Sequence, residues 1–292
     1  MVIFPFAKIN LGLNVVGSRS DGFHEIESVL VPVPLEEALE VVPDPTLPNG
    51  TIELVRSGRA VPGHVGSDLC VRAYQVVHEK YPLPGVRAHL HKVIPIGAGL
   101  GGGSSDGAHM LHALNGLFDL DLEPAELHHF ATILGSDCPF FLGRTPQLAH
   151  GRGEQLRPIP TTIGGLWMLL VDPGIHVSTG DVYASAPHSG RSIDLAAILQ
   201  REPGTWRSLL VNALEGPAFQ KFPELLEIKE SLYRDGALYA SMSGSGSSVF
   251  GLFLERPDAL RKNGNGEQWI FRFPKDDPHE TAASARLSIS GE

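Results

Sequence analysis

The 292-residue chain contains only two cysteines, Cys70 and Cys138, and it has fewer basic than acidic side chains. Two cysteines exclude a disulfide scaffold and a four-cysteine zinc site. With 23 Lys and Arg against 33 Asp and Glu, the formal net charge is −10. Sequence-independent binding of DNA or RNA needs a dense basic face, which this balance does not favour. A local cradle of backbone N–H groups can still bind one phosphorylated small molecule.

Long hydrophobic runs are also missing. No segment approaches the roughly 18 apolar residues that span a bilayer. The N-terminus, Met1 to Lys8, lacks the basic leader and apolar stretch of a signal peptide. We therefore expect a cytoplasmic protein that binds small molecules, with no nucleic-acid or membrane partner, as a monomer or a homodimer.

Glycine (33) and proline (23) are abundant, so the expected secondary-structure elements are short. Strands are predicted at 7–16, 25–33, 37–42, 51–55, 87–94, 166–171 and 249–253. Helices are predicted at 68–81, from 104 onward, at 124–134, 194–200, 206–214 and 224–233. The Pro- and Gly-containing segment 158–165 is the predicted boundary between an N-terminal domain, 1–157, and a C-terminal domain, 158–274. The polar tail, 275–292, is expected to be disordered.

The most informative segment follows the strand at 87–94 and reads PIGAGLGGGSS over residues 95–105. So many glycines would destabilise a strand or a helix, which indicates that bare backbone is required there. A strand, a glycine loop and a helix in this order direct free N–H groups and a helix dipole at an anion. A phosphate-binding loop is therefore predicted, and the alternative is a flexible surface loop with Ser104 as a helix N-cap. The segment is neither a Walker A motif nor a dinucleotide-binding Gly-x-Gly-x-x-Gly motif.

Two polar side chains share one face of the predicted N-terminal strand. Lys8 and Asn10 are two residues apart, so they point the same way, whereas Ile9 and Leu11 point to the core. The alternative is a solvated strand edge.

Three further segments are ambiguous when each is considered alone. Asp137 lies among apolar neighbours and is either a general base or the cap of a short helix that begins near Pro139, and these roles are compatible. The sequence DGFH at 21–24 is either functional or simply a hairpin turn. The loop 241–248 is a second glycine- and serine-rich nest, but such loops are common linkers.

Together these motifs resemble the GHMP kinase superfamily. The motifs that carry the resemblance are AKINL at 7–11, DGFH at 21–24, GLGGGSS at 99–105, LGSDCPFF at 134–141 and SMSGSG at 241–246. The match spans roughly residues 4–273. It implies an α+β fold of two domains, with ATP and the substrate in the cleft between them. The triple glycine and DGFH resemble the branch that phosphorylates the 2-hydroxyl of a cytidine-diphosphate-linked methylerythritol in the non-mevalonate isoprenoid pathway.

The resemblance also assigns roles, position by position. Lys8 and Asp137 would be the catalytic pair. The substrate would be bound by Asn10, Phe23, His24, Thr179 and Tyr183, with Tyr183 stacked on the cytosine. ATP would be bound by Lys92, Pro95, Gly97, Gly99, Leu100, Gly101, Gly102, Gly103, Ser104, Ser105, Ser243, Gly244, Ser245 and Gly246, with Lys92 near the adenine. Mg²⁺ would be held mainly through the phosphates, with Ser105 as the candidate protein ligand.

Three positions depart from the family pattern. Asp68 stands where Asn is usual, Ala213 where an acid is usual, and Cys138 where a small apolar residue is common. None of them belongs to the expected catalytic pair, so they bear on affinity rather than on the reaction class.

Two other functions compete with this interpretation. The first is another GHMP kinase, of the homoserine or mevalonate type. The aromatic set of Phe23, His24 and Tyr183 argues against it, because an aliphatic substrate has no base to stack. The second is a nucleotide-binding relative without turnover, which the presence of both Lys8 and Asp137 disfavours.

Overall fold

The computed structural model describes residues 1–260 and 266–275, and these residues form an α+β fold. Its strands lie in three four-stranded sheets. The first sheet has the order β1 (Val2–Ile3), β4 (Ala38–Pro43), β6 (Val86–Lys92), β5 (Ile52–Gly58). The second has the order β2 (Phe6–Ser18), β3 (His24–Glu36), β7 (Gln147–His150), β8 (Gln155–Pro158). The third has the order β10 (Tyr239–Met242), β11 (Val249–Phe253), β9 (Trp167–Asp172), β12 (Glu267–Arg272).

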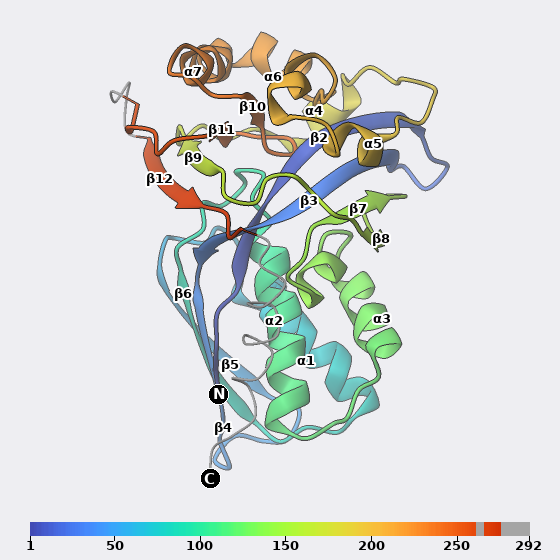
Figure 1. Ribbon diagram of the computed structural model, residues 1–292. Helices are drawn as coiled ribbons and strands as arrows, with labels where there is room; N and C mark the ends of the chain where they lie inside the picture. Colours follow the sequence, from blue (N-terminus) through green and yellow to red (C-terminus); the bar gives the residue numbers. More distant parts are fainter. Residues whose placement is uncertain (261–265, 276–292) are drawn as a thin grey trace.

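Three helices form the lower half of the molecule in Figure 1 together with the first sheet: the first two pack against that sheet, and the third packs on the other two. They are α1 (Leu69–Lys80), α2 (Gly102–Leu117) and α3 (Pro124–Leu134); the short 3₁₀ helix η1 (Val65–Ser67) precedes α1, and η2 (Cys138–Leu142) follows α3. Asp68 is the N-cap of α1, and its carboxylate accepts a hydrogen bond of 3.0 Å from the Cys70 N–H. Because Asp and Asn cap equally well, the departure at Asp68 leaves the helix start intact.

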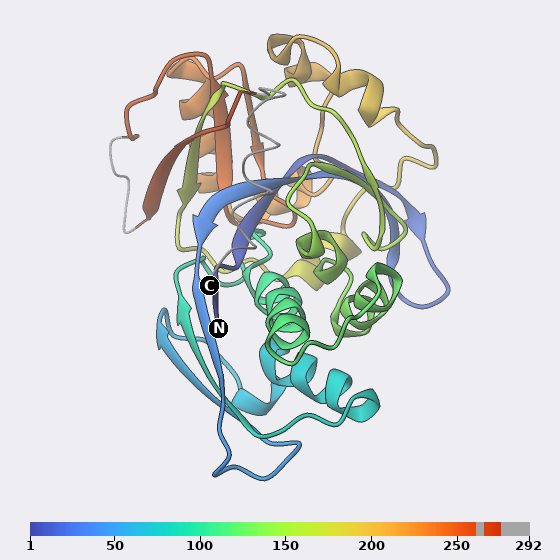
Figure 2. The same ribbon diagram turned by 60° about the horizontal axis from the view of Figure 1, so that its bottom comes forward.

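The long hairpin of β2 and β3 joins the two halves of the molecule (Figures 1 and 2). Each strand has 13 residues and extends well beyond the predicted 7–16 and 25–33. Ile9 and Leu11 on β2 lie in the same hydrophobic core as Leu170 on β9 and Phe250 on β11. Residues on both sides of the predicted boundary at 158–165 therefore share one core.

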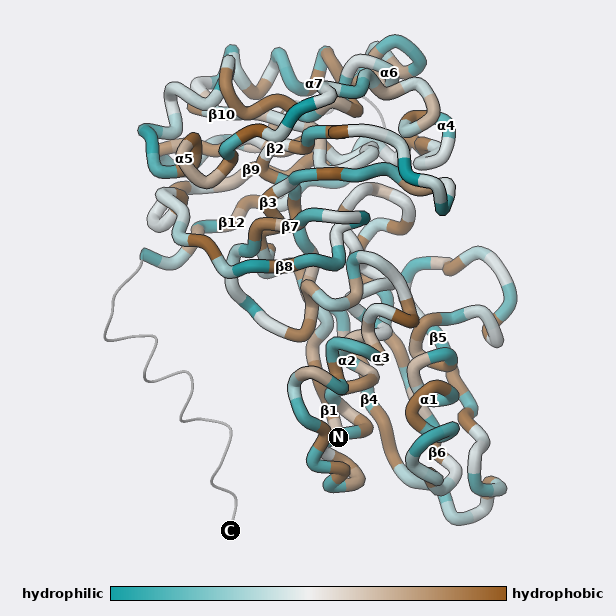
Figure 3. The backbone as a smooth tube through the Cα atoms, turned by 90° about the vertical axis from the view of Figure 1, so that its right-hand side faces the viewer, coloured by the Kyte–Doolittle hydropathy of each residue, from teal (hydrophilic) through white to brown (hydrophobic). Residues whose placement is uncertain are grey.

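The upper half carries the remaining helices around the third sheet. They are α4 (Thr179–Ala184), α5 (Leu195–Leu199), η3 (Pro203–Ser208), α6 (Glu215–Lys221) and α7 (Pro223–Arg234). Helix α7 packs on β10 and β11 and buries Leu225 and Leu232. The alternation of brown and teal along α7 in Figure 3 reflects this single apolar face.

Two predictions about this half need comment. The helix predicted at 206–214 is wrong, because only the short η3 forms and the chain then pairs with β2 through a parallel bridge between Leu13 and Asn212. The tail predicted at 275–292 lies, after Lys275, outside the described residues. No helix in the part of the chain that the structure describes is both long enough and apolar enough to cross a bilayer.

Candidate active site

Two cavities meet at the glycine loop, residues 97–103. The loop cavity, of about 370 Å³, lies between that loop and the segment before α1, and its lining includes Arg56, His64, Asp68, Lys92, Pro95, Gly103 and Ser104. The lysine cavity, of about 230 Å³, lies on the other side, and its lining includes Lys8, Asn10, Asp137, Arg152, Thr179, Tyr183, Gly244 and Ser245. Gly97, Gly99 and Gly101 line both cavities. A ligand that crosses the loop can therefore reach from one cavity into the other.

The glycine loop needs glycine for physical reasons. Gly99 and Gly101 have φ values of +77° and +73°, in the left-handed region that other residues avoid. A Cβ on Gly99 would lie 1.9 Å from the Ser243 carbonyl oxygen, whereas a Cβ on Gly103 would meet nothing within 4 Å. Gly101 is the N-cap of α2, so Ser104 lies within the helix and the alternative of a Ser104 cap is wrong. The uncapped start of α2 is thus available to an anion.

The second glycine-rich loop packs directly on the first. The Ser243 hydroxyl donates to the Gly99 carbonyl at 2.9 Å, and the Ser248 N–H donates to the Ala98 carbonyl at 3.1 Å. The buried Asn212 amide donates to the Gly244 carbonyl at 2.8 Å. The structure therefore brings together two motifs that are far apart in the sequence, and it shows that the loop 241–248 is not a linker.

Lys8 and Asn10 are buried on β2 and share one face, as predicted. The two residues are 4% and 3% exposed, so the alternative of a solvated strand edge is wrong. The Lys8 ammonium donates to Asn10 Oδ1 at 2.7 Å, and the Asn10 amide donates to Ser28 Oγ at 2.8 Å. The Lys8 backbone N–H donates to the Leu100 carbonyl at 2.9 Å, which fixes β2 against the glycine loop.

Asp137 faces Lys8 across the lysine cavity. It precedes η2, but its carboxylate makes no capping hydrogen bond, so the interpretation of Asp137 as a helix cap is wrong. Its Oδ2 lies 3.7 Å from Lys8 Nζ, an ion pair somewhat longer than a hydrogen bond. Burial lowers the pKa of Lys8 below its ordinary value, and the charge of Asp137 opposes that shift. A carboxylate that is 38% exposed beside a buried cation can accept a proton from an alcohol.

An aromatic group lies at the rim of the lysine cavity. The His24 ring lies 5.2 Å from the Tyr183 ring and 5.6 Å from the His188 ring, measured between centroids. Phe23 is 49% exposed, and the Arg152 guanidinium lies 4.7 Å over its ring. The segment 21–24 is a hairpin turn and also places two aromatic residues at this rim. His188 and Arg152 carried no sequence signal that selected them.

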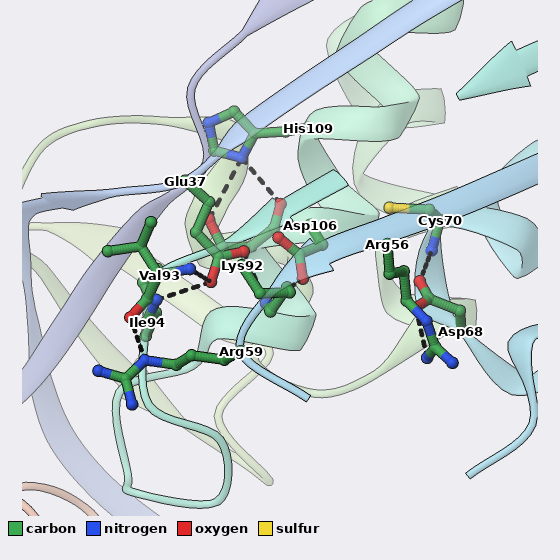
Figure 4. Close-up of polar contacts among 11 residues, drawn as sticks. Glu37, Arg56, Arg59, Asp68, Cys70, Lys92, Val93, Ile94, Asp106 and His109 are labelled. Carbon is green, nitrogen blue, oxygen red and sulfur yellow. Dashed lines mark hydrogen bonds and ion pairs between the residues drawn. The ribbon is translucent and has the colours of Figure 1, made fainter. Parts of the chain in front are cut away.

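Lys92 is buried and paired with two carboxylates. Its ammonium lies 2.6 Å from Glu37 Oε2 and 2.5 Å from Asp106 Oδ2 (Figure 4). A Cβ on Gly102 of the glycine loop would lie 3.5 Å from this ammonium. Glu37 also accepts a hydrogen bond of 2.9 Å from the Ile94 N–H. Burial opposes the charge of Lys92, but the two carboxylates outweigh it and raise its pKa. Lys92 lines the loop cavity, and these two carboxylates compensate its charge inside the protein. That Lys92 lies near the adenine stays a prediction.

Ser105 lies inside the protein and not on the wall of the loop cavity. It is fully buried, its hydroxyl lies 3.3 Å from His109 Nδ1 one helical turn later, and it does not line the loop cavity. The position of the hydroxyl therefore argues against Ser105 as a ligand of Mg²⁺, whereas Ser104 lines that cavity. Among the described residues no group of three His, Cys, Asp or Glu side chains is arranged to hold a metal ion. Mg²⁺ takes few protein ligands, so the Ser104 hydroxyl in the loop cavity fits a metal that is held mainly by the ATP phosphates.

Two family models match the chain. The model described as GHMP kinases N terminal domain matches residues 68–144, and the model described as GHMP kinases C terminal matches residues 194–266. A 4-diphosphocytidyl-2-C-methyl-D-erythritol kinase of Cytophaga hutchinsonii is 43% identical over 265 residues, which cover 90% of this chain and 96% of the relative. The kinase of the same name from Bacteroides fragilis is 43% identical over 256 residues, covering 87% and 92%.

Solved structures give the same picture. The crystal structure of a 4-(cytidine 5′-diphospho)-2C-methyl-D-erythritol kinase superposes with a TM-score of 0.72 and 36% identity, over 86% of this chain and 90% of that one. Mevalonate kinase of Methanococcus jannaschii superposes with a TM-score of 0.65 over 87% and 90%. At 15% identity, the latter similarity concerns the fold alone. The predicted GHMP kinase fold is confirmed by these matches.

Proposed function

Because the chain belongs to the 4-diphosphocytidyl-2-C-methyl-D-erythritol kinases of the GHMP family, we propose that its two cavities place ATP and the acceptor on opposite sides of the glycine loop. The chain is a small-molecule kinase of the non-mevalonate isoprenoid pathway. Its acceptor is the cytidine-diphosphate-linked methylerythritol after which its relatives are named, and the group phosphorylated is the 2-hydroxyl.

The loop cavity would bind ATP. Free backbone N–H groups at the start of α2 and in the glycine loop face the phosphates, and the helix dipole favours their charge. Gly103 supports this placement because no protein atom lies near the position of its absent Cβ. Mg²⁺, bound by the phosphates and by Ser104, would neutralise charge on the transferring group. Ser243, Gly244, Ser245 and Gly246 would close the other side of the phosphates.

The lysine cavity would hold the acceptor hydroxyl. Asp137 accepts the hydroxyl proton, and Lys8 steadies the attacking oxygen and the ionised carboxylate. Asn10 orients the Lys8 ammonium through its 2.7 Å hydrogen bond and is fixed in turn by Ser28. The observation that carries the proposal is this pair of a buried lysine and a partly exposed carboxylate, with Lys8 held against the glycine loop by the backbone hydrogen bond from Lys8 to Leu100.

The rim of the lysine cavity would bind the cytosine. Tyr183 and His24 offer flat faces beside each other, and Phe23 is an exposed ring on the adjacent turn. Stacking on such rings suits a planar base, whereas homoserine and mevalonate have none. Thr179 shares a hydrogen bond of 2.9 Å with Ser245, which links the helix of Tyr183 to the second glycine-rich loop.

Coupled ADP release tests this function. The purified protein with ATP and Mg²⁺ is offered diphosphocytidyl-methylerythritol, homoserine or mevalonate in separate reactions. We expect turnover with the first acceptor alone, and phosphorus NMR of the product should show a new phosphomonoester. Turnover with homoserine or mevalonate in its place would assign the protein to another GHMP kinase class. ATP binding without ADP release for every acceptor would favour the non-catalytic alternative.

A further inference from the structure

A cation at the mouth of the lysine cavity has no role in the scheme above. The charged basic side chains that line this cavity, within the described residues, are Lys8 and Arg152. Lys8 is committed to Asn10 and Asp137. Arg152 is half-buried and not paired with the carboxylates of the adjacent hairpin, because Asp21 and Glu25 bind Arg19 at 3.2 and 2.6 Å. The guanidinium thus retains its hydrogen-bonding capacity for a ligand.

The turn that carries Arg152 is fixed on several sides. Arg152 lies between β7 and β8, flanked by Gly151 and Gly153, which have φ values of +69° and +114°. The Ile26 N–H of β3 donates to the Gly151 carbonyl at 2.8 Å, and the Gly151 N–H donates to Glu25 Oε1 at 3.2 Å. The backbone of the turn is therefore held against β3, and the side chain is presented at a defined place.

That place lies between the two ends of the proposed acceptor. On one side the guanidinium stacks 4.7 Å from the Phe23 ring, at the rim proposed for the cytosine. On the other side the neighbouring Gly153 lies close to Asp137, since a Cβ on Gly153 would be 3.6 Å from Asp137 Oδ1. In a nucleoside-diphosphate-linked polyol, the group between the base and the reacting hydroxyl is the diphosphate.

We infer that Arg152 binds the diphosphate of the acceptor, an inference that rests on the proposed function and adds a specificity-determining residue to it. The planar guanidinium binds phosphate oxygens in a bidentate manner while its face remains on Phe23. The residue thereby couples the recognition of the base to the recognition of the charge. It also disfavours acceptors that lack a diphosphate, because they offer the guanidinium no phosphate oxygens to bind.

Competition by fragments of the acceptor separates this role from a structural one. Cytidine, cytidine monophosphate and cytidine diphosphate are tested as inhibitors competitive with the diphosphocytidyl acceptor, for the wild type, Arg152→Gln and Arg157→Gln. Arg157 is an exposed arginine on β8 of the same hairpin that does not line the cavity, so it is the matched control. Hydrogen bonds to charged groups contribute enough that Arg152→Gln should weaken inhibition by cytidine diphosphate about 10-fold or more. Inhibition by cytidine should change by less than about 3-fold, because the base contacts remain.

Each other outcome has a distinct meaning. If Arg152→Gln weakens inhibition by cytidine and by cytidine diphosphate equally, Arg152 acts only by supporting Phe23. If it raises only the KM for ATP, Arg152 binds the ATP phosphates. Either result overturns the inference. Arg152→Lys, which keeps the charge but not the planar fork, should give an intermediate ratio and serves if Arg152→Gln does not fold. If the wild type turns over normally and Arg152→Gln leaves the ratio of the inhibition constants of cytidine and cytidine diphosphate unchanged, only the role of Arg152 is refuted. If the wild type shows no turnover, the proposed function itself is refuted.

Discussion

Two buried lysines on strands of different sheets have opposite environments. Lys8 on β2 has one partner carboxylate at 3.7 Å, on a side chain that is 38% exposed. Lys92 on β6 has two, at 2.6 and 2.5 Å, on side chains that are at most 4% exposed. The pKa of Lys8 is lowered because burial dominates, whereas the pKa of Lys92 is raised because its carboxylates dominate.

This difference distinguishes a lysine that can act on a substrate from a lysine that stabilises the fold. At Lys8 the charge is under-compensated and faces a cavity, so a substrate can complete its environment. At Lys92 the charge is fully compensated, and the group ties β6 to α2 and to the segment before β4 beneath the glycine loop. Burial raises the pKa of Asp106, in this cluster of Lys92, Glu37 and Asp106 (the Lys92 cluster), well above its ordinary value. Buried lysine alone is thus a poor marker of catalysis, and its partners decide.

The largest expected effect is the loss of chemistry on the Lys8 side. Asp137→Asn keeps the size of the side chain but cannot accept a proton, so kcat should fall by about 10²–10⁴-fold. Lys8→Met should be similarly inactive, and the double variant should be little worse, because groups that act as a unit are non-additive. Stopped-flow or coupled assays give kcat, and calorimetry checks that both substrates still bind.

A control variant tests whether the loss of kcat is specific to Asp137. Asp181→Asn removes a carboxylate on α4 that pairs with Lys221 and does not line the lysine cavity, so its kcat should stay near that of the wild type. The unfolding midpoint of Asp137→Asn should also be close to the wild-type value, since no capping hydrogen bond is lost. A folded Asp137→Asn protein with near-normal kcat would remove Asp137 from the mechanism.

The next effect is on stability, on the Lys92 side. Lys92→Met leaves two buried carboxylates without a counter-charge, and breaking such a pair typically costs about 3–5 kcal/mol of unfolding free energy. Adding Asp106→Asn to this variant should recover part of the loss, because one of the two charges is removed. Urea unfolding followed by circular dichroism measures both changes.

A surface pair provides the matched control for Lys92. Lys80 also pairs with a carboxylate, Glu126, but its side chain is 61% exposed, so Lys80→Met should destabilise the fold far less. Equal losses for Lys92→Met and Lys80→Met would mean that the buried cluster does not hold the first sheet to α2. The kcat of folded Lys92→Met should remain far above that of Lys8→Met.

Sequence reasoning anticipated the Lys8 side far better than the Lys92 side. Lys8 and Asn10 are two residues apart on one strand, so the alternation of side chains alone predicts their shared face. The high glycine content of the loop predicts its location. Glu37 is 55 residues from Lys92 in the sequence, and no local pattern joins them. Arg152 is likewise positioned by a turn that is pinned to β3.

Local patterns failed where a tertiary contact overrides them. Residues 206–214 have helical periodicity, yet the side chain of Asn212 binds the carbonyl groups of Met242 and Gly244, and its backbone pairs with Leu13. These contacts hold the second glycine-rich loop in place and break the helix. The strand β12, with intermediate burial and mixed polarity, shows no clear alternation and was not predicted.

The smallest expected effect concerns the pH dependence of kcat, and it reports the tuning of Lys8 directly. Because the pKa of Lys8 in the folded protein lies below the ordinary 10.5, Lys8 loses its proton, and kcat falls, at a lower pH than for an exposed lysine. The stability of the fold changes with pH in the opposite direction to kcat. Between the folded-state pKa and 10.5 the unfolded chain binds more protons than the folded protein, so the contribution of Lys8 to the free energy of unfolding rises with pH.

Asn10→Asp sharpens this last comparison. It replaces the amide oxygen that Lys8 donates to at 2.7 Å by a carboxylate, which favours the ammonium and should move the alkaline limb of kcat to higher pH. Lys92→Met should leave the limb where it is, because Lys92 lies in a separate cluster with its own carboxylates. Profiles of kcat against pH at saturating ATP and acceptor, for the wild type and both variants, decide the matter. An alkaline limb that is unchanged by Asn10→Asp but moves with Lys92→Met would assign the titrating cation to the Lys92 cluster, and the roles of the two lysines would have to be exchanged.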